Sequence, residues 1–441
     1  MNFFDYTLDF NPYITAVNNA TRFQIEGKIV KLVGLIAEGN GIGMSIGSLC
    51  EIATDTGDVL KAEVVGFKEN RVLLMPYGDT RGIRPGNRLR LINNDPLAEV
   101  GDGFLGRVVD GMGKPIDGKG PIYTEMKYPL YGKPINPMQR EPIHSMMDVG
   151  VTAINMMIPL GQGQRVAIMA GSGVGKSVLM GMMTKHTAAD VSIIGLIGER
   201  GREVKDFVLQ NLGKEGMKRA VVVAATSDSP ALVRMRGAYL ATTLAEYFRD
   251  QGKNVLLIVD SITRFAMSSR DVGLAAGEPP TSRGYTPSFF AKIPVLLERA
   301  GNLIGKGSIT GIYTVLVEGD DMNDPVGDTV RSIVDGHIVL SRDLANRGHY
   351  PAIDVLASVS RVMRDVSTKE HLDLRKKTIE IMATYKQAED MISIGAYVDG
   401  SNLKIDYAKQ YMPKINTFLS QAIETKASYK QGFNMMKELY K

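Results

Sequence analysis

The chain has 441 residues, of which 44% are hydrophobic and 23% charged, a composition typical of a soluble globular protein with more than one domain. Its 52 Lys and Arg residues against 48 Asp and Glu give a net charge of +4, too mild and dispersed to indicate nucleic acid as a partner. One cysteine excludes an intrachain disulfide, and no apolar run approaches the roughly 20 residues that a membrane-spanning helix needs. We therefore expect a cytoplasmic protein.

The first 20 residues form a short polar-punctuated stretch that carries six large apolar side chains, namely Phe3, Phe4, Tyr6, Leu8, Phe10 and Tyr13. Such a stretch is either an amphipathic segment that docks on a partner or an arm packed on its own domain. We assign residues 1–20 as a partner-docking segment, with the self-packed arm as the alternative.

Residues 21–92 contain short β-rich runs separated by Gly, Asp and Asn, which predicts a small β-barrel. The polar residues of these runs are spread as on a solvated surface, and we interpret this domain as an assembly module. A loop-rich stretch from Leu97 to Pro134 follows, dense in turn-forming dipeptides.

Residues 93–350 are assigned to a nucleotide-binding domain, because strands and helices alternate from Gly163 to about Leu340. The predicted strands are 165–169, 191–197, 220–224, 255–259, 309–317 and 336–340. This alternation predicts an α/β fold with a mostly parallel sheet, whose ligands bind beyond the carboxyl ends of the strands. Residues 351–441 are predicted to be a C-terminal α-helical domain, with one break at 394–402.

The run AGSGVGKS, Ala170–Ser177, lies between an apolar strand and an apolar helical pattern, which is the order of a phosphate-binding P-loop. Glycines allow backbone N–H groups to turn toward phosphate oxygens, the lysine reaches the β- and γ-phosphates, and the hydroxyl ligates Mg²⁺. Ala170 stands where the first glycine of this motif is usual. We therefore predict ATP and Mg²⁺ as ligands, with nucleotide contacts from Gly171, Ser172, Gly173, Val174, Gly175, Lys176, Ser177 and Val178, and with Ser177 at the metal.

Hydrolysis also requires an acid that anchors the metal, a base for water and positive charge for the transition state. Asp260 ends the apolar strand VLLIVD and is assigned to Mg²⁺, although an aspartate that caps the next helix is the plainer alternative. The segment LIGERGREV delivers several charges directly after another strand. We assign Glu199 as the base, Arg200 to the phosphates and Glu203 to the metal's water shell.

Together these motifs resemble the hexameric ATPase family that includes the subunits of rotary ATP synthases and the ATPases of type III protein export. The run PAIDVLASVS, Pro351–Ser360, resembles the family signature P-[SAP]-[LIV]-[DNH]-x-x-x-S-x-S at every specified position. The resemblance implies that Arg361 reaches into a neighbouring subunit's site and that Tyr350 packs against adenine. Without it, a helix-capping arginine and a buried tyrosine are the simpler interpretations.

The resemblance also implies a homohexamer, because one chain carries both Glu199 and Arg361. The runs LIGERGREVKDF and KQAEDMISIGAY resemble the export ATPases. The flagellar type is our prediction and the injectisome type is the alternative, since the catalytic core barely separates the two branches. Such an enzyme would promote chaperone release and delivery of substrates to the membrane export gate, at the inner face of the cytoplasmic membrane, with a stator-like partner on the N-terminal segment. A catalytically weak ring scaffold and an RNA-translocating hexamer are the alternatives, although the barrel lacks the aromatic and basic face of RNA readers.

Overall fold

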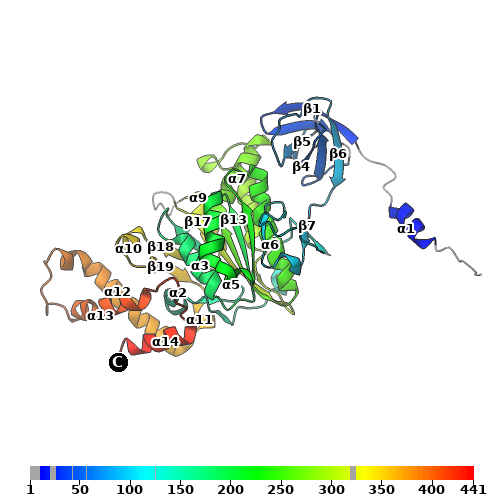
Figure 1. The fold of residues 1–441 in the computed structure, drawn as a ribbon. Coiled ribbons are helices and arrows are strands. Elements are labelled where there is room, and N and C mark those ends of the chain that lie inside the picture. Colours follow the sequence, from blue (N-terminus) through cyan, green and yellow to red (C-terminus); the bar gives the residue numbers. More distant parts are fainter. Residues whose placement is uncertain (1–9, 20–25, 42, 56, 125, 318–323) are drawn as a thin grey trace, which may run out of the picture. The chain divides into compact units, whose positions relative to one another are not determined.

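The computed structural model describes residues 10–19, 26–41, 43–55, 57–124, 126–317 and 324–441. Its chain divides into two compact units, Met1–Pro96 and Leu97–Lys441. In the predicted docking segment, Phe3, Phe4, Tyr6 and Leu8 lie outside the described residues, whereas Phe10 precedes helix α1 (Asn11–Asn19) (Figure 1). The exposed large apolar side chains of this part are Phe10, Tyr13, Ile14 and Val17, at positions i, i+3, i+4 and i+7, which share one helical face.

The first unit contains a closed six-stranded barrel, which confirms the predicted β-barrel. Its strands are β1 (Glu26–Val33), β2 (Ile36–Asn40), β3 (Leu49–Ala53), β4 (Val59–Lys68), β5 (Arg71–Pro76) and β6 (Arg88–Asn93), in the spatial order β1-β2-β5-β4-β3-β6. Alternate residues of each strand point inward, and Ile52, Val64 and Leu74 are fully buried there. Cys50 is also inside, and burial raises the pKa of its thiol to about 12, so it behaves as a small apolar side chain.

The second unit is built on a nine-stranded sheet with the order β19-β18-β12-β17-β15-β13-β14-β8, in which β16 pairs with β17. The strands are β8 (Val108–Asp110), β12 (Arg165–Ala170), β13 (Val191–Ile197), β14 (Ala220–Ala225), β15 (Asn254–Asp260), β16 (Gly301–Asn302), β17 (Ser308–Leu316), β18 (Gly336–Leu340) and β19 (Ile353–Ser360). The pairs from β18 to β8 are parallel and β19 is antiparallel to β18, so the predicted mostly parallel sheet is confirmed.

Two edge strands extend this sheet beyond the sequence prediction. β8 lies within the stretch predicted to be loop, and it is too short for its periodicity to stand out. β19 lies after the boundary predicted at residue 350, yet it pairs with β18. The sheet therefore runs to Ser360, and the helical region begins after it. Two small ladders accompany the sheet, β7 (Leu97–Val100) with β9 (Met126–Pro129) and β10 (Met146–Met147) with β11 (Leu160–Gly161).

Helices cover both faces of the sheet (Figure 1). One layer holds α6 (Ala231–Asp250), α7 (Ile262–Ala275), α8 (Pro287–Leu297) and α9 (Pro325–Ile333). The other holds α2 (Thr152–Met157), α3 (Lys176–His186), α4 (Gly201–Asp206), a π-helical turn (Phe207–Leu212) and α5 (Gly213–Met217). The short α10 (Arg342–Asn346) follows β18, and short 3-10 turns occupy Asp102–Phe104, Pro137–Gln139 and Ser282–Gly284.

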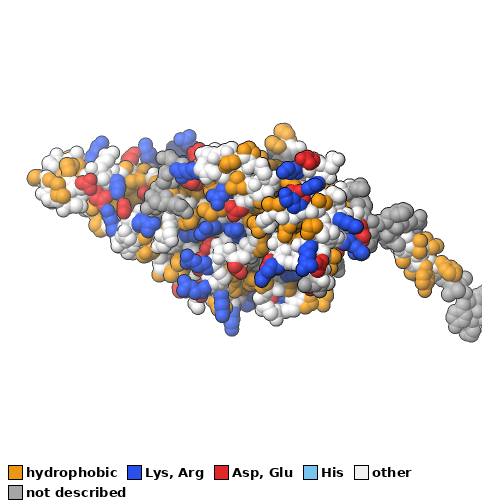
Figure 2. Space-filling view, turned by 90° about the horizontal axis from the view of Figure 1, so that it is seen from above, with side chains coloured by type: hydrophobic (Ala, Val, Ile, Leu, Met, Phe, Trp, Pro, Cys, Tyr) orange, Lys and Arg blue, Asp and Glu red, His pale blue; other side chains and the backbone are white. Residues whose placement is uncertain are grey.

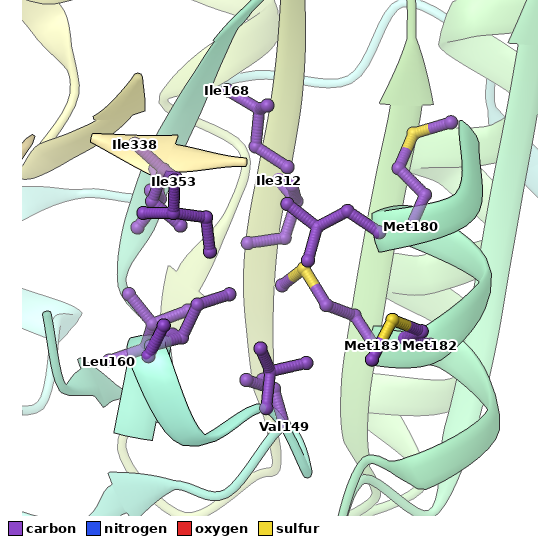
Figure 3. Close-up of a cluster of buried hydrophobic side chains, with 14 of the residues drawn as sticks. Val149, Leu160, Ile168, Met180, Met182, Met183, Ile312, Ile338 and Ile353 are labelled. Carbon is purple, nitrogen blue, oxygen red and sulfur yellow. The ribbon is translucent and has the colours of Figure 1, made fainter. Parts of the chain in front are cut away.

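The helix that follows the P-loop is held by a methionine-rich contact (Figure 3). Met180, Met182 and Met183 of α3 belong to one buried cluster with isoleucines of the sheet, of which the close-up labels Ile168, Ile312, Ile338 and Ile353, and Met183 reaches toward them. All of these side chains are at most 2% exposed. Flexible thioethers fill the irregular gaps between β-branched side chains, and this packing fixes the start of α3 against the sheet.

The C-terminal helices are α11 (Met363–Val366), α12 (Lys369–Ser393), α13 (Leu403–Leu419) and α14 (Tyr429–Glu438), which confirms the predicted helical domain. The predicted break at 394–402 is the turn between α12 and α13. His371 and Arg375 of α12 join this domain to α2. The His371 Nε2 lies 2.8 Å from the Met156 carbonyl oxygen, and the Arg375 Nε donates to the Met157 carbonyl at 2.6 Å. These contacts satisfy carbonyls at the C-terminal end of α2.

No helix in the described part of the chain is long and apolar enough to cross a membrane. On the face seen in Figure 2, lysine and arginine side chains are interspersed with acidic and apolar ones.

Candidate active site

Three parallel strands of the sheet deliver the predicted site residues to one edge. β12 leads into the P-loop, β13 ends two residues before Glu199, and β15 ends at Asp260. These strands are parallel, and Leu196 pairs with Asp260 in the register of β13 and β15. Since the carboxyl ends of parallel strands lie at the same edge, the residues that follow them converge there.

The P-loop occupies residues 171–175, between β12 and α3. Gly173 and Gly175 have φ of 79° and 92°, in the left-handed region that glycine adopts without strain. Val174 is buried and anchors the loop, whereas Ser172, Ser177 and Val178 are exposed. The N–H groups of the first turn of α3 have no partner within the helix, which makes this end a site for phosphate oxygens.

Lys176 lies between two carboxylates. Its Nζ bonds to Asp260 Oδ1 and lies 3.5 Å from Glu199 Oε1. Burial would lower the pKa of Lys176, but the charges of Asp260 and Glu199 outweigh it and raise that pKa, so the ammonium is charged. The Asp260 side chain is only 2% exposed, and this charge neutralises it.

Glu199 has the electrostatics of a general base. Burial raises its pKa to about 7, with a further contribution from the negative charge of Asp260, against the opposing charge of Lys176. A carboxyl group that titrates near neutral pH can take a proton from water and release it again. Its side chain is 20% exposed, so it is partly open to solvent rather than enclosed in the core. We refer to the carboxyl edge of the sheet at Lys176, Glu199 and Asp260 as the P-loop crevice.

Arg200 and Glu203 lie at the rim of this cluster. The Arg200 side chain is 77% exposed, and its Nη1 donates to Glu203 Oε1 at 3.2 Å. Arg200 directly precedes α4 as its N-cap residue. The Glu203 carboxyl lies beside Glu199 and contributes to the raised pKa of Glu199. Within this chain, Arg200 therefore pairs with Glu203 and is not gathered with Lys176.

Tyr350 and Arg361 lie at opposite edges of the sheet. The Tyr350 ring is 47% exposed, and its carbons lie 3.6 Å from where a Cβ on Gly175 would stand, so the ring borders the P-loop. Arg361 follows β19, whose Ser360 pairs with Gly336 at the first residue of β18. Its backbone N–H donates to the Asp335 carbonyl at 2.9 Å. Arg361 therefore lies at the amino ends of the parallel strands, opposite the P-loop.

Three further residues contact the site and were not predicted. Thr314 Oγ1 of β17 donates to Asp260 Oδ1 at 2.5 Å. Arg342 Nη1 donates to the carbonyl of Ser172 in the P-loop at 3.2 Å. Arg264, in the first turn of α7, packs its aliphatic carbons against Gly198, where an added Cβ would stand 2.8 Å from the Arg264 Cβ. From the sequence, Arg264 could have been proposed as a site residue because it lies four residues after Asp260, which ends a strand.

Ser177 and Asp260 offer a hydroxyl and a carboxylate at this edge, and hard oxygen ligands of this kind suit Mg²⁺. Among the described residues, no group of three or more His, Cys, Asp and Glu could hold a metal. A site with one hydroxyl and one carboxylate suits a metal that takes its other ligands from nucleotide phosphates and water, as Mg²⁺ does in nucleotide-hydrolysing enzymes.

Comparison with known families places these features in three adjacent models. The model "ATP synthase alpha/beta family, beta-barrel domain" matches residues 29–90, and the model "ATP synthase alpha/beta family, nucleotide-binding domain" matches residues 150–360. The model "T3SS EscN ATPase C-terminal domain" matches residues 367–438. Together they cover the barrel, the sheet that carries the P-loop, and the helical domain.

Individual relatives match over nearly the whole chain. A flagellum-specific ATP synthase of Bacillus subtilis (strain 168) is 50% identical over 434 residues, which are 97% of this chain and 98% of the relative. The structure of the assembled ATPase EscN from the type III secretion system of enteropathogenic E. coli superimposes with a TM-score of 0.89 at 44% identity, over 94% of this chain and 99% of that one. The structure of EscN with its central stalk EscO gives 0.87 at 43% identity, over 94% and 99%.

Proposed function

The chain belongs to the ATP synthase alpha/beta family, in the branch of flagellum-specific ATP synthases and type III secretion ATPases, and we propose how its P-loop crevice performs ATP hydrolysis. The observation that carries the proposal is the convergence of Lys176, Glu199 and Asp260 at one edge of the sheet. Because a base lies 3.5 Å from the P-loop lysine, the crevice is suited to hydrolysis and not only to nucleotide binding, which argues against a ring scaffold.

Lys176 exchanges its carboxylate partners for the β- and γ-phosphates when ATP enters, since a flexible ammonium bonds equally to either kind of oxygen. The exchange leaves Glu199 with less positive charge nearby, which strengthens it as a base toward the attacking water. Tyr350 supplies an apolar ring beside the P-loop for the adenine. Arg264 packs against Gly198, the residue before Glu199, and we assign its guanidinium as a source of positive charge for the phosphoryl group.

Ser177 and Asp260 would hold Mg²⁺, with Glu203 at its water shell. The metal, when bound, neutralises charge on the phosphates. Arg200 stays at the rim, where rotation of its exposed side chain away from Glu203 would bring its guanidinium toward phosphate oxygens.

Arg361 is proposed to serve a neighbouring subunit. β12 has six residues and rises about 3.3 Å per residue, so roughly 20 Å separates Arg361 from its own P-loop. That distance is far beyond the reach of an arginine side chain. A ring of identical chains, each offering Arg361 to the next, would complete every site, and six subunits is the number that the family resemblance implies.

Mixing two inactive variants tests this shared site. Arg361→Ala chains keep Lys176 and Glu199, whereas Lys176→Ala chains keep Arg361. We expect Arg361→Ala to lose roughly 10³- to 10⁵-fold in turnover, as for other arginine fingers. In an equimolar mixture, about a quarter of the sites in randomly assembled rings join an intact lysine to an intact arginine, so activity should return toward that fraction of wild type.

The control for this experiment mixes each variant with chains that carry both substitutions, because those rings contain no complete site. If the two single variants form mixed rings and stay inactive, Arg361 has a structural role instead.

The relatives favour flagellar type III export as the process served, with chaperone release and delivery of substrates to the membrane export gate as the proposed work. The cytoplasmic ring would then be peripheral to the inner face of the membrane. The exposed side chains at the turn between α12 and α13 suit a stalk partner, and they are Ile394, Val398 and Leu403, at 78%, 71% and 83% exposure. The apolar face of α1 suits a stator-like partner in the same way.

A further inference from the structure

A buried threonine holds the acid of the candidate active site. Thr314 is fully buried on β17, and its Oγ1 donates to Asp260 Oδ1 at 2.5 Å. Lys176 bonds to the same oxygen. Within the described residues, the hydrogen bonds and ion pairs of the Asp260 carboxylate all go to Oδ1, which leaves Oδ2 without a protein partner there.

The position of Thr314 is fixed from both sides. β17 lies between β12, which leads into the P-loop, and β15, which ends at Asp260. Thr314 pairs with Ile168 in the register of β12, and the preceding residue pairs with Val259 of β15. Beyond Thr314, the Leu316 N–H donates to Thr263 Oγ1 at 2.8 Å and ties the strand to α7. A β-branched side chain on such a strand has little rotamer freedom.

Asp260 loses one of its two partners when Lys176 turns to a phosphate. A carboxylate that is 2% exposed and has no partner would rotate to find another hydrogen-bond donor. Thr314 is then the remaining donor to Oδ1. Its hydrogen bond fixes the orientation of the carboxylate, so that Oδ2, which has no partner among the described residues, stays available to the metal.

We propose that Thr314 is a positioning residue that holds the Asp260 carboxylate for the metal while Lys176 moves to the nucleotide. This inference rests on the roles proposed above for Lys176 and Asp260. It extends them by assigning the metal-binding geometry of the acid to a neutral hydroxyl that does not touch the nucleotide.

The same strand offers a matched control. Thr310 is also fully buried on β17, at the same parity, and its Oγ1 accepts a hydrogen bond from the Gly163 N–H at 2.9 Å. Thr314→Val and Thr310→Val therefore each delete one buried hydroxyl from one strand, and only the first deletion touches Asp260. A purely structural role predicts the same consequences for both.

The test measures the dissociation constant of ADP in the full-length protein with excess Mg²⁺ and again with EDTA. The ratio of the two constants reports how much the metal strengthens binding. We expect Thr314→Val to reduce this ratio roughly tenfold, the size of one hydrogen bond to a charged group. Thr310→Val should leave the ratio within about twofold of wild type, and Thr314→Ser, which keeps the hydroxyl, should restore most of it.

Thermal unfolding of each variant establishes that it is folded, and Thr314→Ala replaces the valine variant if that one does not fold. A wild-type ratio in folded Thr314→Val, or an equal loss in Thr310→Val, overturns the proposal. Asp260→Asn separates the two levels of the argument. If Asp260→Asn also keeps the wild-type ratio of dissociation constants, the proposed metal role of Asp260 fails. If the ratio falls in Asp260→Asn but not in Thr314→Val, only the role of Thr314 is rejected.

Discussion

The two ends of the parallel sheet both carry buried charges, but they pair them differently. At the amino ends of the strands, Arg165 bonds to Asp335 through two nitrogens, each at 3.0 Å, and also pairs with Glu298. Nearby, the fully buried Arg299 bonds to both carboxylate oxygens of Glu246. At the carboxyl ends, one lysine is shared between Asp260 and Glu199.

The difference separates charges that build the fold from charges that are available for chemistry. A planar guanidinium fixed by two or more hydrogen bonds loses all of them together if it moves, so such pairs join segments permanently. An ammonium is a compact charge that can change partners one at a time. Buried charge alone therefore does not identify an active site, and the proposed site rests on the lysine that is shared between two carboxylates.

Removal of the shared lysine should have the largest effect. We expect Lys176→Ala to lower turnover by at least roughly 10²- to 10³-fold, since it removes a charge that acts on the transferred phosphoryl group, and to weaken ATP binding. Lys185 lies on the same helix and pairs at the surface with Glu424, so Lys185→Ala is the matched control and should remain within about twofold of wild type. Turnover near the wild-type value in Lys176→Ala would contradict the proposal that the charges at the carboxyl ends of the strands serve chemistry and those at the amino ends serve the fold.

Removal of a fixed charge at the other end should change stability instead. Arg299→Ala leaves Glu246 buried without its partner, and we expect a loss of about 3–5 kcal/mol in the free energy of unfolding. Denaturant titration measures the loss, and turnover per folded molecule should stay near that of wild type. The result that contradicts this prediction is a stable variant whose turnover has collapsed.

The junction of α2 with the C-terminal helices adds a smaller effect that depends on pH. Burial lowers the pKa of His371 below its ordinary value near 6.5, so the folded chain keeps this histidine neutral while the unfolded chain takes up a proton. Stability should therefore fall as the pH drops below about 6.5. In His371→Gln, whose amide can still donate to the Met156 carbonyl, the slope should be shallower by at most about 1.4 kcal/mol per pH unit.

Wild type and His371→Gln are compared by denaturant titration between pH 5 and pH 8. The pKa values of His186, His337 and His349 are also lowered by burial, and these residues are present in both chains, so the difference in slope belongs to His371. If the free energy of unfolding depends on pH with the same slope in both chains, a residue other than His371 takes up the proton on unfolding.

Lys176, Glu199 and Asp260 could be predicted to lie together because each one follows an apolar strand of a parallel sheet. Thr314 could not, since β17 is inserted between β12 and β15 although it comes later in the chain than both. Strand order depends on tertiary packing, which the motif does not encode. Arg264 was missed for a related reason, because its place beside Gly198 depends on how α7 is rotated against the sheet.

The two edge strands show the same limit at the level of the fold. β8 has three residues and β19 runs against the direction of the other strands, so neither belongs to the alternating pattern that predicted the sheet. The family signature in β19 was recognised as a motif, yet the motif does not state with which strand it pairs. The assignment of Arg361 to a neighbouring subunit rests on the resemblance and stays a proposal, and the direction of β19 adds that Arg361 lies away from its own P-loop.

Glu199→Gln tests most directly whether the cluster of Lys176, Glu199 and Asp260 is the site of ATP hydrolysis. The amide keeps the shape of the side chain but cannot accept a proton from water, so ATP affinity should stay within a few-fold of wild type while turnover falls roughly 10²- to 10⁴-fold. Both quantities are measured on the same preparation, with bound ATP and released phosphate followed together. Wild-type turnover in this variant would contradict the assignment of Glu199 as the base and would place the activation of water elsewhere in the crevice.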